Sequence, residues 1–131
     1  DKPDTIEAFH STDGGRSWEL LGTVTVMQVH SNPPAVVKLQ DGRLCCAYGD
    51  RQSATILARY SDDNGRSWGP EVTIRDGYQS VADDPDSKPG GFADMGYVRL
   101  VQRPDGKLVA IYYWATAEHP QHHIAASIWQ P

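Results

Sequence analysis

The sequence predicts an all-β protein folded as a partial β-propeller of about two to three four-stranded blades. Short runs rich in Val, Ile, Leu, Tyr and Trp alternate with turns that contain Gly, Asp, Asn and Pro, and no helical apolar period persists for three turns. One motif recurs with its aspartates, Asp13 and Asp63, 50 residues apart. This spacing fits a repeat of ~40 to 50 residues, the length of a propeller blade.

The motif has two copies, STDGGRSW at 11–18 and SDDNGRSW at 61–68. A strand-like segment precedes each copy, TIEAFH before the first and TILARY before the second. A third segment of this kind, HHIAASIW at 122–129, carries no motif after it. We expect one strand at each of these segments and another after each motif.

Two further segments, 36–50 and 98–114, each predict a hairpin, because two strand-like runs flank an Asp-Gly turn. The predicted order is therefore two strands, then four, then three. We interpret residues 1–30 as half a blade, 31–77 as a complete blade and 78–131 as a last blade that lacks its fourth strand.

Residues 1–131 thus form one partial propeller that does not close. Propellers typically have 4 to 8 blades, and open sheet edges are a liability. We expect the missing blades to come from a longer chain, of which this is the C-terminal part, or from other copies in a homo-oligomer.

Composition excludes two classes of partner. The net charge is −5 and the basic residues are scattered, which does not fit a nucleic-acid surface. No apolar run approaches the ~18 residues of a membrane span, so we expect no membrane partner. Cys45 and Cys46 are adjacent in a predicted strand and would face opposite sides, which predicts two packed free thiols rather than a disulfide.

The repeated motif has a structural explanation at each fixed position. An Asp carboxylate can accept backbone N–H bonds across a turn, Gly supplies a positive φ, and Trp can pack beneath the hairpin. The motif resembles the Asp box of sialidases and related BNR-repeat propellers. We interpret the boxes as folding devices rather than catalytic sites; their residues are Ser11, Asp13, Gly15, Trp18, Ser61, Asp63, Gly65 and Trp68.

The topology of an up-and-down blade places both boxes and both Asp-Gly turns at one end of the sheets. The other end, where we expect a ligand, receives the polar segments 30–35, 49–54, 75–96 and 115–123. Segment 75–96 is longer than its counterpart, so it is either a binding loop or disordered.

Tyr97 is the candidate catalytic residue at that end. Its segment resembles the part of sialidases that carries the tyrosine nucleophile, although Val98 and Arg99 stand where that family has a small residue. The resemblance implies a six-bladed propeller that hydrolyses terminal sialic acids with retention. A phenol of pKa ~10 needs a neighbouring carboxylate as base. The alternative is an aromatic residue that packs at a strand start.

Three other residues are candidates for substrate binding. Arg51 stands where the resemblance implies the last member of an arginine triad that grips a sugar carboxylate. Arg99 shares strand parity with Tyr97, and for both arginines a surface salt bridge is the alternative. Trp114 could stack on a sugar ring or simply pack within a blade. The family's acid and its activating glutamate come from blades outside this sequence.

We expect no metal and no cofactor. His119, His122 and His123, with Glu118, and the segment DDPDSK at 83–88 lack the spacing of established metal sites.

The resemblance implies a sialidase-like glycoside hydrolase that acts on an acidic, sialylated glycan once the missing blades complete it. Two alternatives stay open: a polysaccharide lyase that acts on a uronate-containing glycan, and a non-catalytic propeller for carbohydrate binding or assembly. The lyase would use the same residues. A glycan substrate favours a secreted or periplasmic location, which the sequence does not fix.

Overall fold

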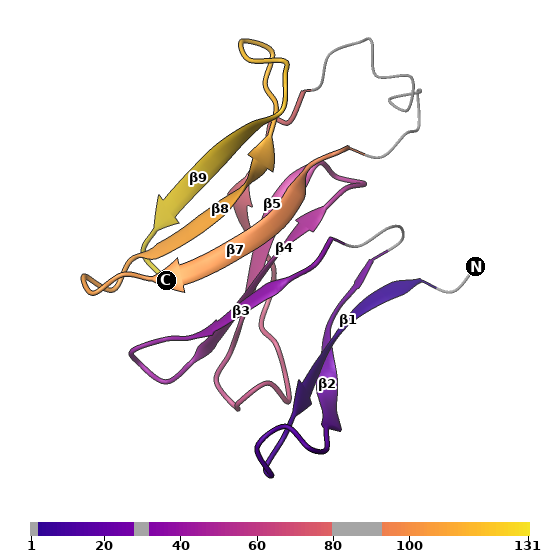
Figure 1. Cartoon of the computed structure of the whole chain (residues 1–131), viewed down its shortest axis with the longest axis vertical. Helices are drawn as coiled ribbons and strands as arrows, with labels where there is room; N and C mark the ends of the chain where they lie inside the picture. The colour runs from indigo at the N-terminus through magenta and orange to yellow at the C-terminus, as the bar shows by residue number, and fades with distance from the viewer. Residues whose placement is uncertain (1–2, 28–31, 80–92) are drawn as a thin grey trace.

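The computed structural model describes residues 3–27, 32–79 and 93–131. These residues form nine strands in three antiparallel sheets (Figure 1). The strands are β1 (Asp4–His10), β2 (Glu19–Met27), β3 (Ala35–Lys38), β4 (Leu44–Asp50), β5 (Thr55–Ser61), β6 (Val72–Arg75), β7 (Gly96–Gln102), β8 (Leu108–Trp114) and β9 (His123–Trp129).

Each strand pairs with its neighbour in sequence, in the orders β1-β2, β3-β4-β5-β6 and β7-β8-β9. The all-β fold is confirmed, and the described strands group as two, four and three as the sequence predicts. Gly42 and Gly106, in the two Asp-Gly turns, have φ of 94° and 85°, a conformation that glycine adopts without strain. The assignment of the three sheets to blades of a larger ring stays a prediction.

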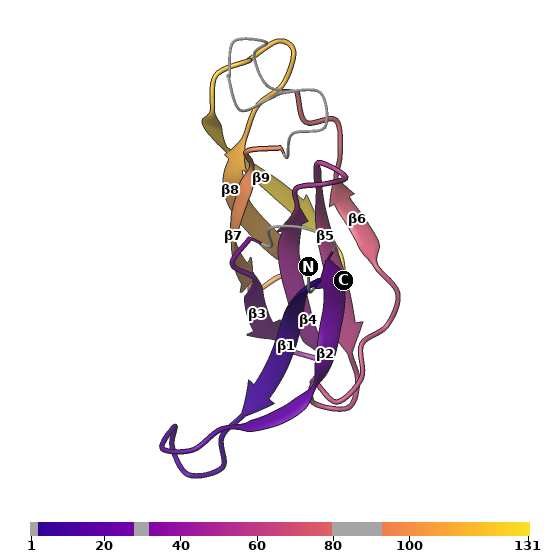
Figure 2. The same ribbon diagram turned by 90° about the vertical axis from the view of Figure 1, so that its right-hand side faces the viewer.

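The β3–β6 sheet is the centre of the fold because both its faces are covered. Figure 2 shows the β1–β2 hairpin in front of this sheet and β7–β9 behind it. Cys45 and Ala47 pack in the core shared with β7–β9, whereas Cys46 and Tyr48 pack in the core shared with β1–β2. The prediction for the cysteines is confirmed: both are buried free thiols on opposite faces.

The loops lie at two ends of the strands. In Figure 1 the two box loops and the Asp-Gly turns lie at the lower ends, while 51–54 and 115–122 lie at the upper ends. Of the predicted ligand-end segments, 28–31 and 80–92 lie outside the described residues, and so does DDPDSK. The described upper loops therefore define the candidate site.

Candidate functional site

Three side chains from different segments meet at the upper end of the sheets. Arg51 follows β4, Asp94 precedes β7, and Tyr113 lies near the end of β8. Arg51 Nη2 lies 2.9 Å from Asp94 Oδ1 and donates a 3.0 Å hydrogen bond to Tyr113 Oη. Tyr113 Oη in turn donates to Asp94 Oδ1 at 2.5 Å. We call Arg51, Asp94 and Tyr113 the upper cluster.

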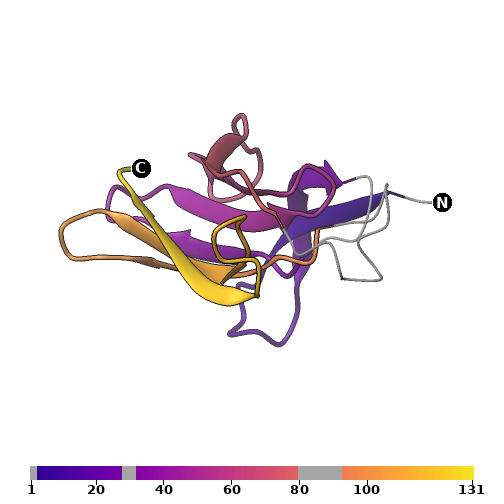
Figure 3. The ribbon, with the colours of Figure 1, turned by 90° about the horizontal axis from the view of Figure 1, so that it is seen from above.

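A histidine and a second tyrosine extend the upper cluster. Tyr78 Oη donates to the Asp94 carbonyl at 2.9 Å and lies 3.1 Å from His122 Nε2. Because a phenol has one proton to donate, this arrangement requires His122 Nε2 to carry the proton of the second bond. The His122 ring also meets the Tyr113 ring edge to face, with centroids 5.4 Å apart. Figure 3 looks down on this end, where the 115–122 loop lies over β8 and β9.

The environment of Tyr113 keeps its phenol protonated. Burial, and then the hydrogen bond to Asp94, raise the pKa of Tyr113 to about 12, against an opposing effect of Arg51. At neutral pH Tyr113 is therefore a hydrogen-bond donor, and Asp94 is the group positioned to take its proton.

Tyr97 lies beside the upper cluster in an unusual backbone conformation. Its φ is 54°, a left-handed value that is uncommon for a bulky residue, and a β-bulge separates Gly96 from Arg99 in the pairing with β8. Its ring centroid is 5.7 Å from that of Tyr113. The ring is half exposed, and among the described residues its hydroxyl makes no hydrogen bond.

A buried asparagine fixes the backbone before Tyr97. Asn32 Nδ2 donates to the Met95 carbonyl at 2.6 Å, and Asn32 is almost fully buried. Gly96 has φ of 115°, and a Cβ there would lie 2.5 Å from Asn32 Nδ2. Only glycine fits this close approach, so Asn32 and Gly96 together fix the backbone that leads into Tyr97 at the start of β7.

The structure corrects the sugar-stacking role considered for Trp114. Its side chain is 0% exposed, lies in the core, and meets the rings of Tyr78 and Tyr112 edge to face. Trp114 shares strand parity with Leu108 and Tyr112, so it points to the covered face of β8. It cannot present its ring to a ligand.

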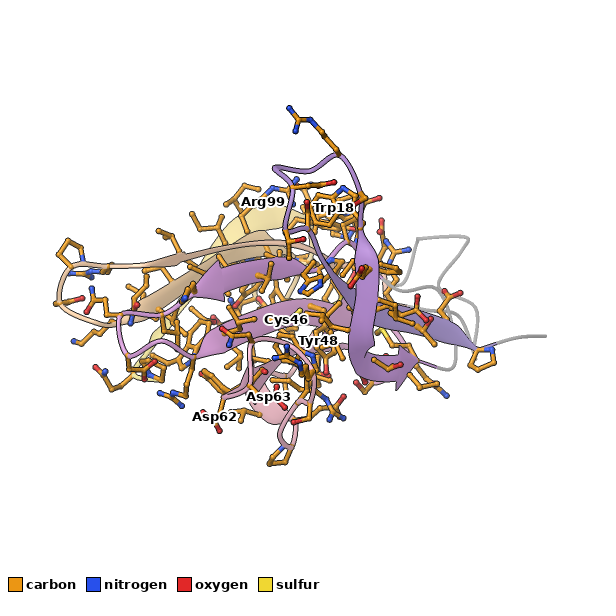
Figure 4. The ribbon with its side chains drawn as sticks, turned by 90° about the horizontal axis from the view of Figure 1, so that it is seen from below. Trp18, Cys46, Tyr48, Asp62, Asp63 and Arg99 are labelled. Carbon is orange, nitrogen blue, oxygen red and sulfur yellow. The ribbon has the colours of Figure 1, made fainter. Side chains whose placement is uncertain are left out.

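Arg99 lies apart from the upper cluster. Its Nη1 donates to the neighbouring carbonyl of Val98 at 3.1 Å, and none of its described contacts involves Arg51, Asp94 or Tyr113. Figure 4 shows Arg99 on the side of β7–β9 away from the central sheet. Tyr97 and Arg51 are thus brought to one end of the sheets, and Arg99 and Trp114 are not part of that group.

The two predicted boxes share one hydrogen-bond pattern. In the second, Asp63 Oδ1 accepts from the Ser67 backbone N–H at 2.8 Å and from Ser61 Oγ at 2.8 Å, and Oδ2 accepts from Ser67 Oγ at 2.6 Å. These bonds lower the pKa of Asp63 to about 2. Asp13 makes the same bonds to Ser11 and Ser17, and its pKa is also lowered.

The box tryptophans differ from each other. Both indoles donate from Nε1 to a box carbonyl at 3.2 Å, Trp18 to Gly15 and Trp68 to Gly65. Trp68 packs against the core as predicted, whereas Trp18 is 62% exposed, which corrects the expectation for the first box. The β1–β2 sheet has only two strands and leaves this ring uncovered among the described residues.

A polar network between β1–β2 and the central sheet was not found from the sequence. Glu71 Oε1 accepts from Tyr48 Oη at 2.8 Å and from Thr25 Oγ1 at 3.1 Å, and lies 3.4 Å from Arg59 Nη2. Burial raises the pKa of Tyr48 to about 12. Tyr48 is fully buried, whereas Glu71 is exposed, so this network joins two sheets and reaches the surface at Glu71.

An apolar cleft of about 540 Å³ lies between β1 and β3, away from the upper cluster. Its lining includes Phe9, Val36, Leu44 and Trp68. It lies at the junction of the β1–β2 hairpin and the central sheet. Within the described ranges no three His, Cys, Asp or Glu side chains converge on a possible metal position, and no helix is long and apolar enough to cross a membrane.

Comparison with known proteins identifies the fold. No family model matches the sequence, and no curated protein matches it. One solved structure with a similar fold is an alpha-L-arabinanase from Penicillium chrysogenum, complexed with arabinobiose. The TM-score is 0.69 at 16% identity, over 98% of this chain and 37% of that chain. The chain therefore has an all-β fold of several antiparallel sheets that corresponds to about a third of a propeller glycosidase.

The upper cluster contains residues that sequence reasoning missed. Neither Tyr113 nor Asp94 was a candidate from the sequence, and His122 was considered only as a metal ligand. A reactive phenol needs a carboxylate neighbour, so this requirement could have directed attention to an acidic residue close to Tyr97 in the sequence. Asp94 is two residues before the glycine that starts the Tyr97 strand.

Proposed function

We propose that this chain forms part of a glycoside-processing propeller and that the upper cluster, with Tyr97, is its contribution to the sugar-binding face. One observation carries the proposal. The charged, hydrogen-bonding upper cluster lies beside the half-exposed ring of Tyr97 at the upper end of the sheets. Sugar sites combine hydrogen-bond partners for hydroxyls with aromatic faces for the ring.

Two features of Arg51 and Tyr97 support a ligand at this position. Arg51 Nε is buried and has no hydrogen-bond partner among the described residues. Buried donors are normally satisfied, so an orphan donor calls for a partner. Tyr97 is held in a left-handed conformation by its surroundings, and such conformations concentrate at functional sites.

The specific mechanism we propose is hydrolysis through a tyrosine nucleophile, the sialidase-like chemistry expected from the sequence. The geometry favours Tyr113 over Tyr97 for that role, because Tyr113 has a carboxylate within hydrogen-bonding distance. Asp94 would accept the Tyr113 proton as the phenolic oxygen attacks the anomeric carbon. The acid that protonates the leaving group would come from outside the described residues.

The pairing of Arg51 with Asp94 bears on the class of glycan. A guanidinium that is already paired with a carboxylate attracts a sugar carboxylate less strongly than an unpaired guanidinium does. This pairing favours hydroxyl recognition over the grip on an acidic sugar, and it does not favour the lyase alternative, which needs a cation to neutralise a uronate. A non-catalytic sugar-binding propeller remains the second candidate, because the upper cluster contains a single carboxylate, Asp94.

Calorimetry with an α-linked arabino-oligosaccharide and with sialyllactose tests the proposal. We expect binding of at least one sugar and a loss of at least about tenfold, ~1.4 kcal/mol, in Arg51→Ala and Tyr113→Phe. Arg43→Ala is the matched control, because Arg43 pairs with Asp41 at 2.7 Å at the opposite end of β4. Equal loss in Arg43→Ala, or no binding of either sugar, contradicts the proposal.

Hydrolysis is tested separately with fluorogenic arabinosides and sialosides. Turnover that is lost in Tyr113→Phe and kept in Tyr97→Phe supports Tyr113 as nucleophile. The opposite result supports Tyr97, and binding without turnover supports the non-catalytic candidate.

A further inference from the structure

The second box contains the one Asn-Gly bond of the sequence. Its asparagine, Asn64, is followed by Gly65, whereas the other asparagine, Asn32, is followed by a proline that has no N–H. An asparagine before glycine is the pair most prone to spontaneous deamidation, because glycine has no side chain to hinder attack by its own backbone nitrogen. Residues 64–65 therefore carry a reaction that the proposed function does not use.

Backbone conformation explains why an asparagine stands at this position. Asn64 has φ of 59°, and Gly14 at the matching position of the first box has φ of 76°. Asparagine is one of the few residues besides glycine that adopt this left-handed region readily. The Asn64 side chain is exposed and makes no hydrogen bond among the described residues. The loop thus uses the backbone conformation of Asn64 and not its amide group.

Deamidation at this bond needs water alone as co-reactant. The Gly65 backbone nitrogen attacks Asn64 Cγ, so that an N–Cγ bond forms and the Cγ–Nδ2 bond breaks. The Gly65 amide proton passes to solvent, and Nδ2 takes up a proton and leaves as ammonia. Water then opens the five-membered imide at either carbonyl, which gives aspartate or isoaspartate.

The folded loop holds the attacking nitrogen away from this path. The Gly65 N–H donates to Ser61 Oγ at 2.8 Å, and Ser61 is 2% exposed. Trp68 Nε1 donates to the Gly65 carbonyl at 3.2 Å. Gly65 is therefore held at both its nitrogen and its carbonyl. The nitrogen can turn toward Asn64 Cγ only after these hydrogen bonds break.

The β1–β2 hairpin closes over the same loop. A Cβ at Gly22 of β2 would lie 2.5 Å from the Arg66 carbonyl oxygen, so the two backbones are in close contact. A Cβ at Gly65 would meet the Leu21 side chain at 3.5 Å. Gly65 is accordingly buried although Asn64 is exposed. Opening of the second box therefore disturbs the junction between the hairpin and the central sheet.

We propose that Asn64 and Gly65 form a deamidation site that the second box protects, and that isoaspartate formed there loosens the junction of the β1–β2 hairpin with the central sheet. Isoaspartate adds one methylene to the main chain directly before Gly65. The Gly65 N–H and carbonyl then shift relative to Ser61 and Trp68. This inference is independent of the proposed function.

Peptide mapping of the 131-residue chain after incubation at mildly alkaline pH tests the protection. Trypsin releases residues 60–66, in which Asn64 is the only side-chain amide, so the exchange of its NH2 for OH changes the mass of this fragment. The native chain should react at least about tenfold more slowly than the chain in guanidinium chloride, because two hydrogen bonds worth about fivefold each must first break. Equal rates would overturn the proposal.

A serine in each box provides a variant and its matched control. Ser61→Ala should speed the native reaction about fivefold, because it frees the Gly65 N–H. In the first box Ser11 Oγ accepts from the Gly15 N–H at 2.7 Å in the same way. Ser11→Ala should therefore leave the rate at Asn64 unchanged within about twofold.

Two outcomes of this comparison contradict the protection by Ser61. Equal acceleration in both variants would mean that overall stability sets the rate. A slower reaction in Ser61→Ala would mean that the hydroxyl promotes the attack. Circular dichroism checks that both variants fold, and the comparison of native with unfolded wild type stands whether or not they do.

Amide hydrogen exchange tests the loosening of the junction. The isoaspartate form, separated by chromatography, is compared with Asn64→Asp, which carries the same charge without the extra methylene. Exchange in β1 and β2 should be faster in the isoaspartate form and close to the wild-type rate in Asn64→Asp. Identical exchange in the two forms would overturn the claim that isoaspartate loosens the hairpin.

Discussion

Arg51 and Asp94 are 43 residues apart in the sequence, yet Arg51 Nη2 lies 2.9 Å from Asp94 Oδ1. A second link joins the same segments, because the Ala93 backbone N–H donates to the Arg51 carbonyl at 3.0 Å. The end of β4 and the approach to β7 are thus tied by both side chain and backbone. This tie places Tyr113 and Tyr97 next to a carboxylate and a guanidinium.

The first prediction concerns the titration of Tyr113. Asp94→Asn should lower the pKa of Tyr113 from about 12, because it removes the carboxylate that stabilises the protonated phenol. The pKa should stay above that of an ordinary tyrosine, since burial remains. Arg51→Ala should instead raise the pKa of Tyr113, because the Arg51 guanidinium lowers it. Tyrosine Cζ chemical shifts, assigned by comparison with Tyr113→Phe, measure both changes, and identical shifts in the two variants would refute the described network.

The same titration predicts how stability depends on pH. The pKa of Tyr113 is higher in the folded state than the ~10 of an unfolded tyrosine. Its contribution to the free energy of unfolding is therefore fully present below pH 10 and is lost as the pH rises through about 12. Tyr113→Phe should show a shallower loss of stability over this alkaline range than the wild type.

The second prediction separates steric fit from backbone strain at two glycines. Gly42→Ala should cost about 1–2 kcal/mol, because its φ is 94° but a Cβ meets nothing within 4 Å. Gly96→Ala carries the same kind of strain and also places a Cβ 2.5 Å from Asn32 Nδ2. We expect it to cost at least about twice as much in urea unfolding. Equal costs would mean that Asn32 does not constrain the start of β7.

The third prediction compares two adjacent aspartates. Asp63 accepts three hydrogen bonds within its loop, while its neighbour Asp62 is exposed (Figure 4). Asp63→Ala should lower the midpoint of thermal unfolding, and Asp62→Ala should leave it nearly unchanged. The pKa of Asp63 is lowered to about 2, so its contribution is present above about pH 4 and is lost as the pH falls toward 2. A similar midpoint for both variants would contradict a structural role for Asp63.

The fourth prediction concerns thiol reactivity. Burial raises the pKa of Cys45 to about 11 and that of Cys46 to about 12. Since the thiolate is the reactive form, a disulfide reagent at pH 8 should modify neither residue in the native protein and both after denaturation. Rapid labelling of either thiol under native conditions would show that one face of β4 is open.

The strands could be predicted because their signals are local. Residue alternation, the two Asp-Gly turns and the repeat at 50 residues each depend on neighbours in the sequence. Burial of Trp114 was also open to prediction, because its strand parity matches that of Leu108 and Tyr112. The prediction that Trp114 stacks on a sugar relied on its position at the end of a strand and neglected the face of the strand on which its side chain lies.

The upper cluster could not be predicted in the same way. Its residues come from three segments whose meeting depends on how the β7–β9 sheet packs on the central sheet, a long-range relationship with no local pattern. The bulge at Tyr97 adds one residue to β7 and changes which side chains meet. Strand parity alone therefore placed Arg99 with Tyr97 but did not bring it to the cluster.

The most direct test of the central claim is a ¹⁵N NMR titration of the chain with an α-linked arabino-oligosaccharide and, separately, with sialyllactose. If the upper end binds sugar, at least one titration should give its largest shifts at Arg51, Asp94, Tyr97, Tyr113 and His122. Shifts confined to the apolar cleft near Trp68, or no shifts with either sugar, would contradict the assignment of this end as the carbohydrate site.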